Sequence, residues 1–561
     1  MPLNFTNSEK FIELIESEFS REIKYYATSD VAVTAHAVGG PDAENWTQEL
    51  FERKIITSLP LKEKGDRFIE VERTLTALYC SYLQKLNLDE AYNAFIEAQK
   101  NNSEIHQAEI LRKGTFNVFY QKINHIINDK DKADILMRLI IYSDLGKSPQ
   151  FKRTVKQLAE QETIVIDLSL DPDDLISEMF IKFDDKQLES ILPSFSHISQ
   201  KAKNTLRAVY PIMQACFGHI YFLERGEKTF QIIANALSKL PTEERIEALN
   251  LVYLAQFYDG VGAQGQRKIR GSLTCTENFY QGYHFIYEAL MTLNLKLNET
   301  SNVSDAATFA FNDYLNKRAK LLGFESPLSP EKQFLTRMGC TLRGFTAEFG
   351  QILLEEFQKL ESGQKQLLIT QLSFDSQGLE GWTKAHYIAT TPQNVSRALF
   401  SKNCTHDAIV QALKAEVCFA MLIEKMTKEF PSLVTEKARV ISFGEVAFLA
   451  GKSPKDFEPD TFDPKDYTLD LKTSKIVTLP SNQKQISTTI PNQITTPEEL
   501  CSLAREGNTT ALDEVAMRNI LERPEKKKRK LLQGIIDSEV FNEKDKTRLT
   551  EQCEQAKKIK I

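Results

Sequence analysis

The chain has 561 residues, of which 42% are hydrophobic and 26% charged, and its formal net charge is −7. A chain this long exceeds one compact core, so roughly two or three domains are expected. The negative net charge disfavours a nucleic-acid-binding role for the whole molecule, and no apolar run reaches the roughly 18 residues that an integral membrane segment needs. The eight cysteines are widely spaced without a CxxC motif, which is typical of reduced core cysteines in a cytosolic protein.

Helical periodicity dominates the chain up to about residue 450. The N-terminal segment MPLNFTNSEKFIELIESEF predicts an amphipathic helix rather than a signal peptide. Further helices are predicted where apolar residues recur every three to four positions, at residues 66–86, 243–258, 343–360 and 406–426. The strand candidates are ETIVIDLSL (162–170) and KARVISFGEVAFLA (437–450). The expected fold is therefore mainly α, a multi-helix body with at most a minor β element.

Composition divides the chain into four regions. Residues 1–125 form an N-terminal helical region, and residues 126–450 form a helical core that contains the candidate site. Residues 451–495 are rich in Pro, Asp, Ser, Thr and Lys and have few apolar residues, so a flexible arm is expected there. A helical pattern resumes in residues 496–561, which predict a small charged C-terminal helical module.

The sequence SDLGK ends a helical pattern in the core region. It resembles the HDxGK turn of HD-domain phosphohydrolases, in which His and Asp ligate a metal. Asp144 matches the ligand Asp, and Ser143 replaces the ligand His. His125 is the upstream candidate, and Asp171 or Asp173 is the downstream one. Because the central His is missing, the resemblance implies a degenerate HD-type fold without active metal chemistry. The alternative interpretation is a helix C-cap with Gly146 in the left-handed conformation.

The segment DGVGAQGQRKIRGSLTCTENFYQGYHFIYEAL (259–290) combines glycines, basic residues and hydroxyls. It contains the pattern G-x-G-x-x-G, but the preceding segment predicts a helix, whereas a dinucleotide-binding fingerprint requires a strand. Successive glycines can still present backbone N–H groups to an anion, and the basic residues that follow can neutralise phosphate oxygens. The candidate nucleotide-binding residues are Gly262, Gly265, Arg267 and Arg270.

His284 and Glu288 are four positions apart, so both project from one face of a helix. That arrangement suits a His general base oriented by a carboxylate, and the hydroxyl of Ser272 would complete the set. The candidate catalytic residues are therefore His284, Glu288 and Ser272, and no metal ligand is predicted. The alternative is a core histidine among aromatic neighbours with one satisfied hydrogen bond.

A basic run, RPEKKKRKLL, lies near the C-terminus. It resembles a monopartite nuclear-localisation signal, and the alternative interpretation is a solvated basic helix face. The residues concerned are Lys526, Lys527, Lys528, Arg529 and Lys530.

The chain as a whole resembles a translocated effector of the Legionella type, with a large helical body, no classical signal peptide, a polar arm and the tail TEQCEQAKKIKI. One such family, the LnaB-like AMP-transferases, combines a Ser with an HxxxE motif, which Ser272 and the His284–Glu288 pair match; Ser238 would give a wider separation. The resemblance implies a secreted bacterial effector that acts in the host cytosol or nucleus. It also implies transfer of a nucleotidyl group from ATP, with Mg²⁺, to a host protein.

Two other functions stay open. One is a non-enzymatic helical scaffold that binds a host partner, and the other is a degenerate HD-type phosphohydrolase fold. A transferase predicts that the glycine and arginine segment converges with the HxxxE pair on one pocket. A scaffold predicts that the two point to different surfaces.

Overall fold

The structure is a computed structural model. Apart from single residues and short stretches, it describes residues 5–26, 69–102, 107–168, 172–215, 227–265, 270–300, 302–342, 344–372, 405–429, 453–470 and 475–479. The chain divides into two units, Met1–Thr478 and Leu479–Ile561. The helices and strands named below belong to the first unit, and the C-terminal module predicted at 496–561 lies outside the described residues.

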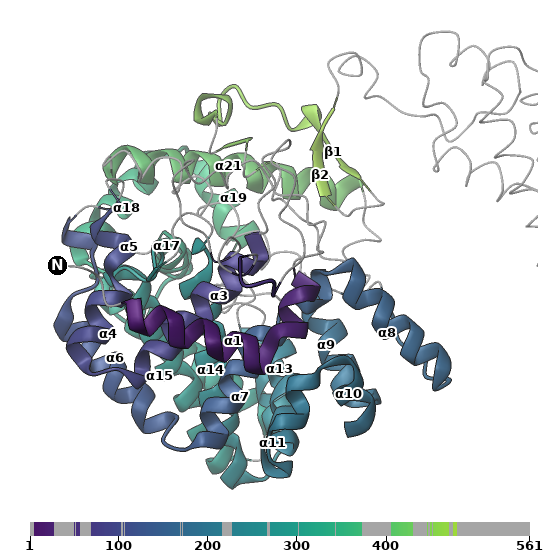
Figure 1. Ribbon diagram of the computed structural model, residues 1–561. Coiled ribbons are helices and arrows are strands. Elements are labelled where there is room, and N and C mark those ends of the chain that lie inside the picture. Colours follow the sequence, from purple (N-terminus) through teal and green to yellow (C-terminus); the bar gives the residue numbers. More distant parts are fainter. Residues whose placement is uncertain are drawn as a thin grey trace, which may run out of the picture. The chain divides into compact units, whose positions relative to one another are not determined.

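Helices make up most of the described chain, so the predicted mainly α fold is confirmed (Figure 1). The longer helices are α1 (Phe5–Tyr26), α3 (Ile69–Tyr82), α6 (Lys113–Ile126), α7 (Lys130–Tyr142), α8 (Pro149–Gln161), α9 (Pro172–Lys182), α11 (Gln200–Ala215), α13 (Glu227–Ser238), α14 (Thr242–Gly262), α15 (Glu277–Glu299), α16 (Val303–Leu321), α17 (Pro330–Thr341), α18 (Ala347–Lys359), α19 (Ser362–Leu372) and α21 (Thr405–Glu429). Shorter helices are α4 (Leu88–Phe95), α5 (Glu97–Lys100), α10 (Asp185–Ile191) and the 3₁₀ turn η4 (Leu145–Lys147).

Helix α14 lies inside the larger of two hydrophobic cores. It packs against α3, α7, α11, α15 and α6. Buried residues occur on all its sides, which is why its sequence is apolar all round rather than along one stripe. This core contains residues from Phe11 to Cys340. It therefore includes side chains from both sides of residue 125, the predicted boundary between the N-terminal helical region and the helical core.

A second core joins α17, α18, α19 and α21 to a small sheet. Strands β1 (Tyr467–Asp470) and β2 (Lys475–Thr478) are antiparallel, with Tyr467 opposite Thr478. The strand candidate at 162–170 is wrong for its described residues, which form turns and irregular chain. Val165 there is 83% exposed, while Ile164, Ile166 and Leu168 are partly buried against the larger core, so the alternating pattern reflects one-sided packing of irregular chain rather than a strand.

The expected flexible arm needs correction at residues 453–470 and 475–478. Aromatic and aliphatic side chains of this segment are buried in the second core, and Lys425 of α21 donates a hydrogen bond to the Tyr467 carbonyl at 2.6 Å. The buried residues are Phe457, Phe462, Tyr467, Leu469 and Ile476. A few well-spaced anchors are therefore enough to order a segment of polar average composition, which a composition argument does not detect. Residues 480–495 lie outside the described part of the chain.

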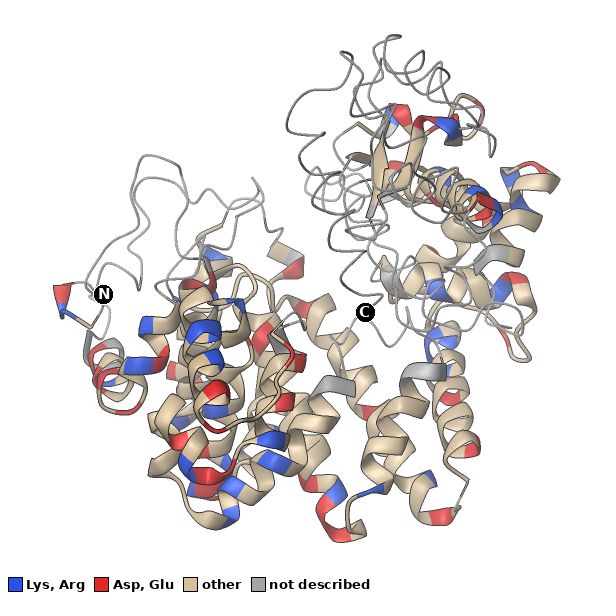
Figure 2. Cartoon of the chain, turned by 90° about the vertical axis from the view of Figure 1, so that its right-hand side faces the viewer, with Lys and Arg blue, Asp and Glu red and all other residues tan. Residues whose placement is uncertain are grey.

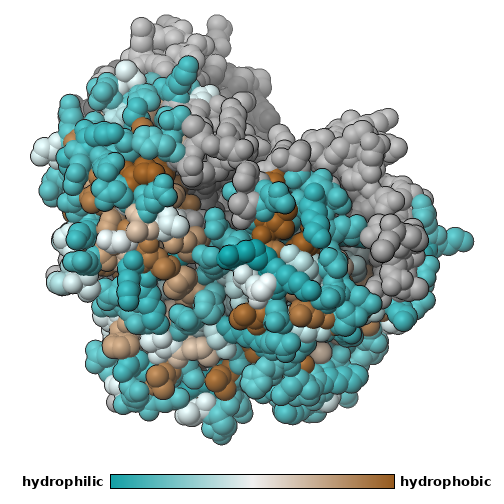
Figure 3. All heavy atoms as spheres, turned by 90° about the vertical axis from the view of Figure 1, so that its left-hand side faces the viewer, coloured by the Kyte–Doolittle hydropathy of each residue, from teal (hydrophilic) through white to brown (hydrophobic). Residues whose placement is uncertain are grey.

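The surface carries charges of both signs. Lys and Arg are interspersed with Asp and Glu on the helices (Figure 2). Hydrophobic residues on the face in Figure 3 form separate patches among hydrophilic ones. Among the described helices, none has the length and apolar character needed to cross a membrane. The described cysteines, Cys80, Cys275, Cys340 and Cys418, are buried in the core, as predicted.

Candidate functional site

The glycines of the G-x-G-x-x-G segment allow close helix packing. Gly262 is the last residue of α14, and a Cβ there would collide with the backbone carbonyl of Arg73 on α3. A Cβ at Gly265 would lie 2.5 Å from the Glu72 carbonyl oxygen. Both glycines thus let the end of α14 approach the α3 backbone, a role that the phosphate-loop interpretation did not anticipate.

Replacing Gly262 by Ala should therefore destabilise the protein. Ala normally stabilises a helix by about 0.5–1 kcal/mol relative to Gly. Here the collision with α3 should reverse the sign, with a loss of about 1–3 kcal/mol. Gly363 of α19 is the control, because a Cβ there would have no neighbour within 4 Å. Denaturant unfolding of Gly262→Ala and Gly363→Ala checks this, and a stabilised Gly262→Ala variant would rule the packing role out.

The segment that follows the glycines is a tightly packed loop. Gly271 has φ +77°, and a Cβ there would lie 2.5 Å from the Phe95 carbonyl oxygen. The buried Gln99 side chain donates hydrogen bonds to the carbonyls of Ser272 and Cys275 at 2.8 and 2.9 Å. Arg270 is half-buried beside this loop, and Arg267 lies outside the described residues.

Ser272 is buried in this loop, and its position gives no support to the prediction that it is catalytic. Its exposed fraction is 0%. Its hydroxyl donates to the Val261 carbonyl at 2.9 Å and accepts from the Cys275 N–H at 3.0 Å. The hydroxyl therefore satisfies backbone groups at the end of α14, a capping use that is common for Ser. The short separation of Ser272 and His284 in the sequence therefore does not determine whether their side chains face the same pocket.

His284 and Glu288 lie together on α15, as their spacing predicts. His284 Nε2 is 3.3 Å from Glu288 Oε1, and the two side chains are 41% and 39% exposed. Burial lowers the pKa of His284, Lys122 lowers it further, and Glu288 opposes both. Within the described chain, the buried Nδ1 has no hydrogen-bond partner. His284 is thus neither deeply buried nor satisfied, so the core-histidine alternative does not describe it.

Lys122 of α6 adjoins this pair and was not predicted. Its Nζ lies 3.1 Å from the centroid of the Tyr287 ring, and the Tyr287 hydroxyl is held by Asn250 of α14 at 3.1 Å. Burial lowers the pKa of Lys122 to about 8, with Glu288 opposing. Among the described residues, no carboxylate lies within ion-pair distance of it.

A sequence signal for Lys122 did exist. Lys122 follows Phe119 by three residues and precedes Ile126 by four, and both of those side chains are buried. A lysine that interrupts the apolar face of an amphipathic helix must place its charge near the core or extend it to the edge.

Lys317 of α16 supplies a second cation. Its Nζ is 2.9 Å from Asp313 Oδ2 and 3.8 Å from Glu288 Oε2. The hydrogen bond with Asp313 is the main reason that its pKa is raised, so Lys317 stays protonated. Lys122, His284, Tyr287, Glu288 and Lys317 are here named the α15 site; they come from three helices. Gly262 and Gly265 contact α3 instead, so these two glycines do not line the α15 site, whereas Gly260 packs against Tyr283 and Phe279 of α15.

The SDLGK turn belongs to a different group of charges. Asp144 pairs with Lys147 at 2.7 Å, and Lys147 also pairs with Glu70 at 3.0 Å. Arg73 connects Glu70, at 3.1 Å, to Asp259, at 3.7 Å. These five residues are here named the Asp144 cluster. Burial alone would raise the pKa of Asp144, but Lys147 and Arg73 outweigh it and hold the pKa at about 2.

The structure also bears on both interpretations of this turn. Gly146 lies in η4, a right-handed 3₁₀ turn, so the left-handed C-cap is wrong. His125 is exposed on α6, and the described residues contain no group of three potential metal ligands. Asp171 lies outside the described residues. Among the described residues, Asp144 thus pairs with a cationic side chain and does not lie in a cluster of potential metal ligands.

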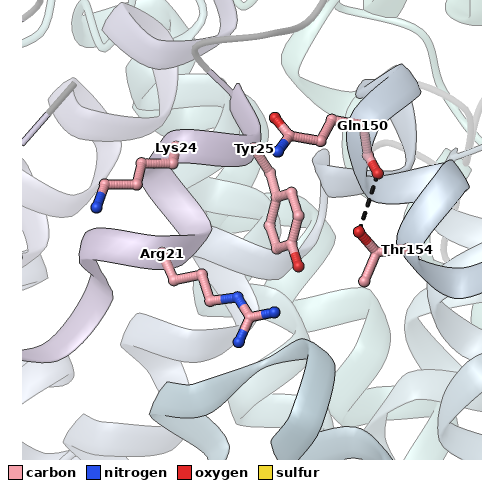
Figure 4. A pocket seen from close by; sticks show the side chains of 5 residues that line it. All are labelled: Arg21, Lys24, Tyr25, Gln150 and Thr154. Atoms are coloured by element: carbon pink, nitrogen blue, oxygen red, sulfur yellow. Dashed lines mark hydrogen bonds between the residues drawn. The ribbon is translucent and has the colours of Figure 1, made fainter. Parts of the chain in front are cut away.

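A cavity of about 350 Å³ lies between α1 and α8. Its lining residues are Arg21, Lys24, Tyr25, Gln150 and Thr154 (Figure 4). Lys24 extends away from the Tyr25 ring, and the Thr154 hydroxyl donates to the Gln150 carbonyl at 3.1 Å. Of the two cationic side chains that line the cavity, Arg21 alone points toward the Tyr25 ring, and one cation is too few for an anion-binding site.

Comparison with known proteins identifies a family. The model of a family of unknown function (DUF6829) matches residues 12–442, which is more than half of the chain, so the chain belongs to this family. The match includes both the α15 site and the Asp144 cluster. No curated protein and no solved structure matches the chain.

Proposed function

We propose that this member of the DUF6829 family is a nucleotidyltransferase that binds its nucleotide at the α15 site. The observation that carries the proposal is Lys122, a half-buried cation without a carboxylate partner in the described chain, next to His284 and Glu288. A charge withdrawn from water needs a counter-charge. A phosphate group would supply it from the solvent side.

Each residue of the site has a role in this proposal. Lys122 and Lys317 neutralise phosphate oxygens. His284 is the general base, and Glu288 orients its ring. The nucleotide would bind as its Mg²⁺ complex, because Mg²⁺ stays with the substrate phosphates and water.

The acceptor in this proposal is a protein of a host cell. The support is the resemblance to translocated effectors, and the family match does not bear on it. The basic run from Lys526 to Lys530, outside the described residues, would direct the protein to the nucleus if it acts as a localisation signal.

A non-enzymatic scaffold is the second candidate. The packing roles of Gly262, Gly265 and Ser272 favour it, because they remove three residues from the site that the sequence predicted. A scaffold needs no nucleotide, so nucleotide binding discriminates between the two functions.

Mg–ATP should raise the melting temperature of the wild-type protein, because a ligand that binds only the folded state stabilises it. Lys317→Met should abolish this rise. Lys320→Met is the matched control, since Lys320 is an exposed lysine of the same helix, and it should respond like the wild type. With ATP labelled at the α-phosphate and a host-cell lysate, His284→Ala and Glu288→Gln should lose labelling of lysate proteins. A wild-type protein that shows neither a melting shift nor labelling would leave the scaffold as the better account.

A further inference from the structure

We propose that Lys122 is the nucleophile that carries the nucleotidyl group covalently before its transfer to the acceptor, an inference that rests on the proposed function of the α15 site. The intermediate would be a phosphoramidate between Lys122 Nζ and the α-phosphorus of the nucleotide. The observation behind this proposal is the position of the Lys122 amine. The amine lies against the Tyr287 ring and beside the His284–Glu288 pair, without a carboxylate at ion-pair distance among the described residues.

Of the two lysines at the site, only Lys122 suits this role. Lys317 is paired with Asp313 and Glu288, which keep it protonated and without a lone pair. Burial of Lys122 lowers its pKa to about 8, so about a tenth of the amine is neutral at pH 7, far more than for an ordinary lysine. A desolvated lysine of lowered pKa is a common form of activated nitrogen nucleophile. The protonated form of Lys122 attracts the phosphate, and its neutral form attacks the α-phosphorus, whereas Lys317 keeps its charge in both steps.

The chemistry balances in two steps. In the first step, the neutral Nζ attacks the α-phosphorus, an N–P bond forms, and the bond from the α-phosphorus to the oxygen bridging to the β-phosphate breaks. Pyrophosphate leaves with that electron pair, and the His284–Glu288 pair takes the proton released from Nζ. In the second step, a hydroxyl of the acceptor attacks the phosphorus and loses its proton to the same pair. The N–P bond breaks, and the pair returns to Lys122 Nζ the proton that it took in the first step.

A structural role is the competing explanation. Lys122 could serve only as a cation–π contact between α6 and α15, since its Nζ also lies 5.5 Å from the Tyr253 ring. Such a contact would explain the position of the amine but would give it no reactivity toward ATP. The two explanations therefore differ in one measurable property, a covalent adduct on this residue.

The test uses the full-length chain, Mg–ATP labelled at the α-phosphate, and no acceptor. After denaturation, the label should remain on the protein, be released by acid as N–P bonds are, and map by mass spectrometry to the peptide containing Lys122. Added pyrophosphate should remove the label and regenerate ATP. Lys122→Arg keeps a positive charge but should lose at least 100-fold of the label. Lys113→Met, which removes an exposed lysine of the same helix, should keep it.

The outcomes separate the two proposals. If Mg–ATP raises the melting temperature but no adduct forms, or an adduct forms on another residue, the covalent role of Lys122 is wrong and the nucleotide site stands. If Mg–ATP neither stabilises nor labels the protein, the nucleotide site itself is wrong, and the covalent role falls with it. Acid-labile label on Lys122 that pyrophosphate reverses supports both.

Discussion

The Lys122→Met variant is expected to be more stable than the wild-type protein while it loses nucleotide binding. Two energies decide the sign of the stability change. Lowering a lysine pKa from 10.5 to about 8 corresponds to roughly 3 kcal/mol against the charged form. Contact of Lys122 with water reduces this penalty, and the cation–π contact with the Tyr287 ring stabilises the charged form by up to about 2 kcal/mol. A net gain of about 1 kcal/mol on removing the charge is the expected result.

The gain should depend on pH in a defined direction. The folded pKa of Lys122 lies below its unfolded value, so the cost of the charged amine is fully present below about pH 8. The cost falls as the pH rises from there to 10.5, where the amine is neutral in both states. The neighbouring groups that titrate or carry charge are His284, Glu288 and Tyr287 on α15 and Tyr253 on α14. The advantage of Lys122→Met over the wild type should follow the same course.

Unfolding by urea at several pH values, together with Mg–ATP melting shifts, checks this prediction. Lys113→Met is the control, because it removes a lysine of the same helix that is half exposed and paired with Asp89. If Lys122 is kept for function at a cost in stability, Lys122→Met should gain stability and lose nucleotide binding together. A Lys122→Met protein that is less stable at pH 7 would instead indicate a structural cation–π contact.

The helices were predictable and the sheet was not, for physical reasons. The buried face of a helix such as α21 can be predicted from the spacing of its apolar residues, because residues three and four positions apart lie on one face. The pair of strands at 467–478 has only four residues in each strand and depends on packing against α21, which no local pattern reveals. The run at 162–170 has the right residue types but pairs with no strand among the described residues.

The candidate site was predictable only where it depended on one helix. His284 and Glu288 share α15, so their spacing alone brings them together. Lys122 and Lys317 reach them from α6 and α16, through contacts that depend on how three helices pack. Ser272 and Gly262 were misassigned for the same reason, since close packing against α3 and α5 determines what they contact.

Asp144→Asn is expected to cost about 3 kcal/mol of stability at pH 7, because it leaves the cations of the Asp144 cluster without one of their anions. Removing one member of a buried ion pair typically costs about 3–5 kcal/mol, and the remaining Glu70 partner of Lys147 argues for the lower end. The exposed pair of Asp89 and Lys113 is a matched control. Its distance is also 2.7 Å, but the Asp89 side chain is 68% exposed, against 14% for Asp144. Asp89→Asn should cost at most about 0.5 kcal/mol.

The pH dependence of the same variant separates a charge effect from a packing effect. The pKa of Asp144 is lowered from 3.8 to about 2, so its stabilising contribution is present above pH 4 and is lost as the pH falls toward 2. The wild type should therefore lose its advantage over Asp144→Asn across that interval. Lys147→Met in the Asp144→Asn background should restore part of the stability, since it removes a cation that has lost one of its two anions, and Glu70 still pairs with Arg73. Equal losses for Asp144→Asn and Asp89→Asn would mean that the SDLGK turn is not held by these charges, and a metal or ligand role for Asp144 would then have to be reconsidered.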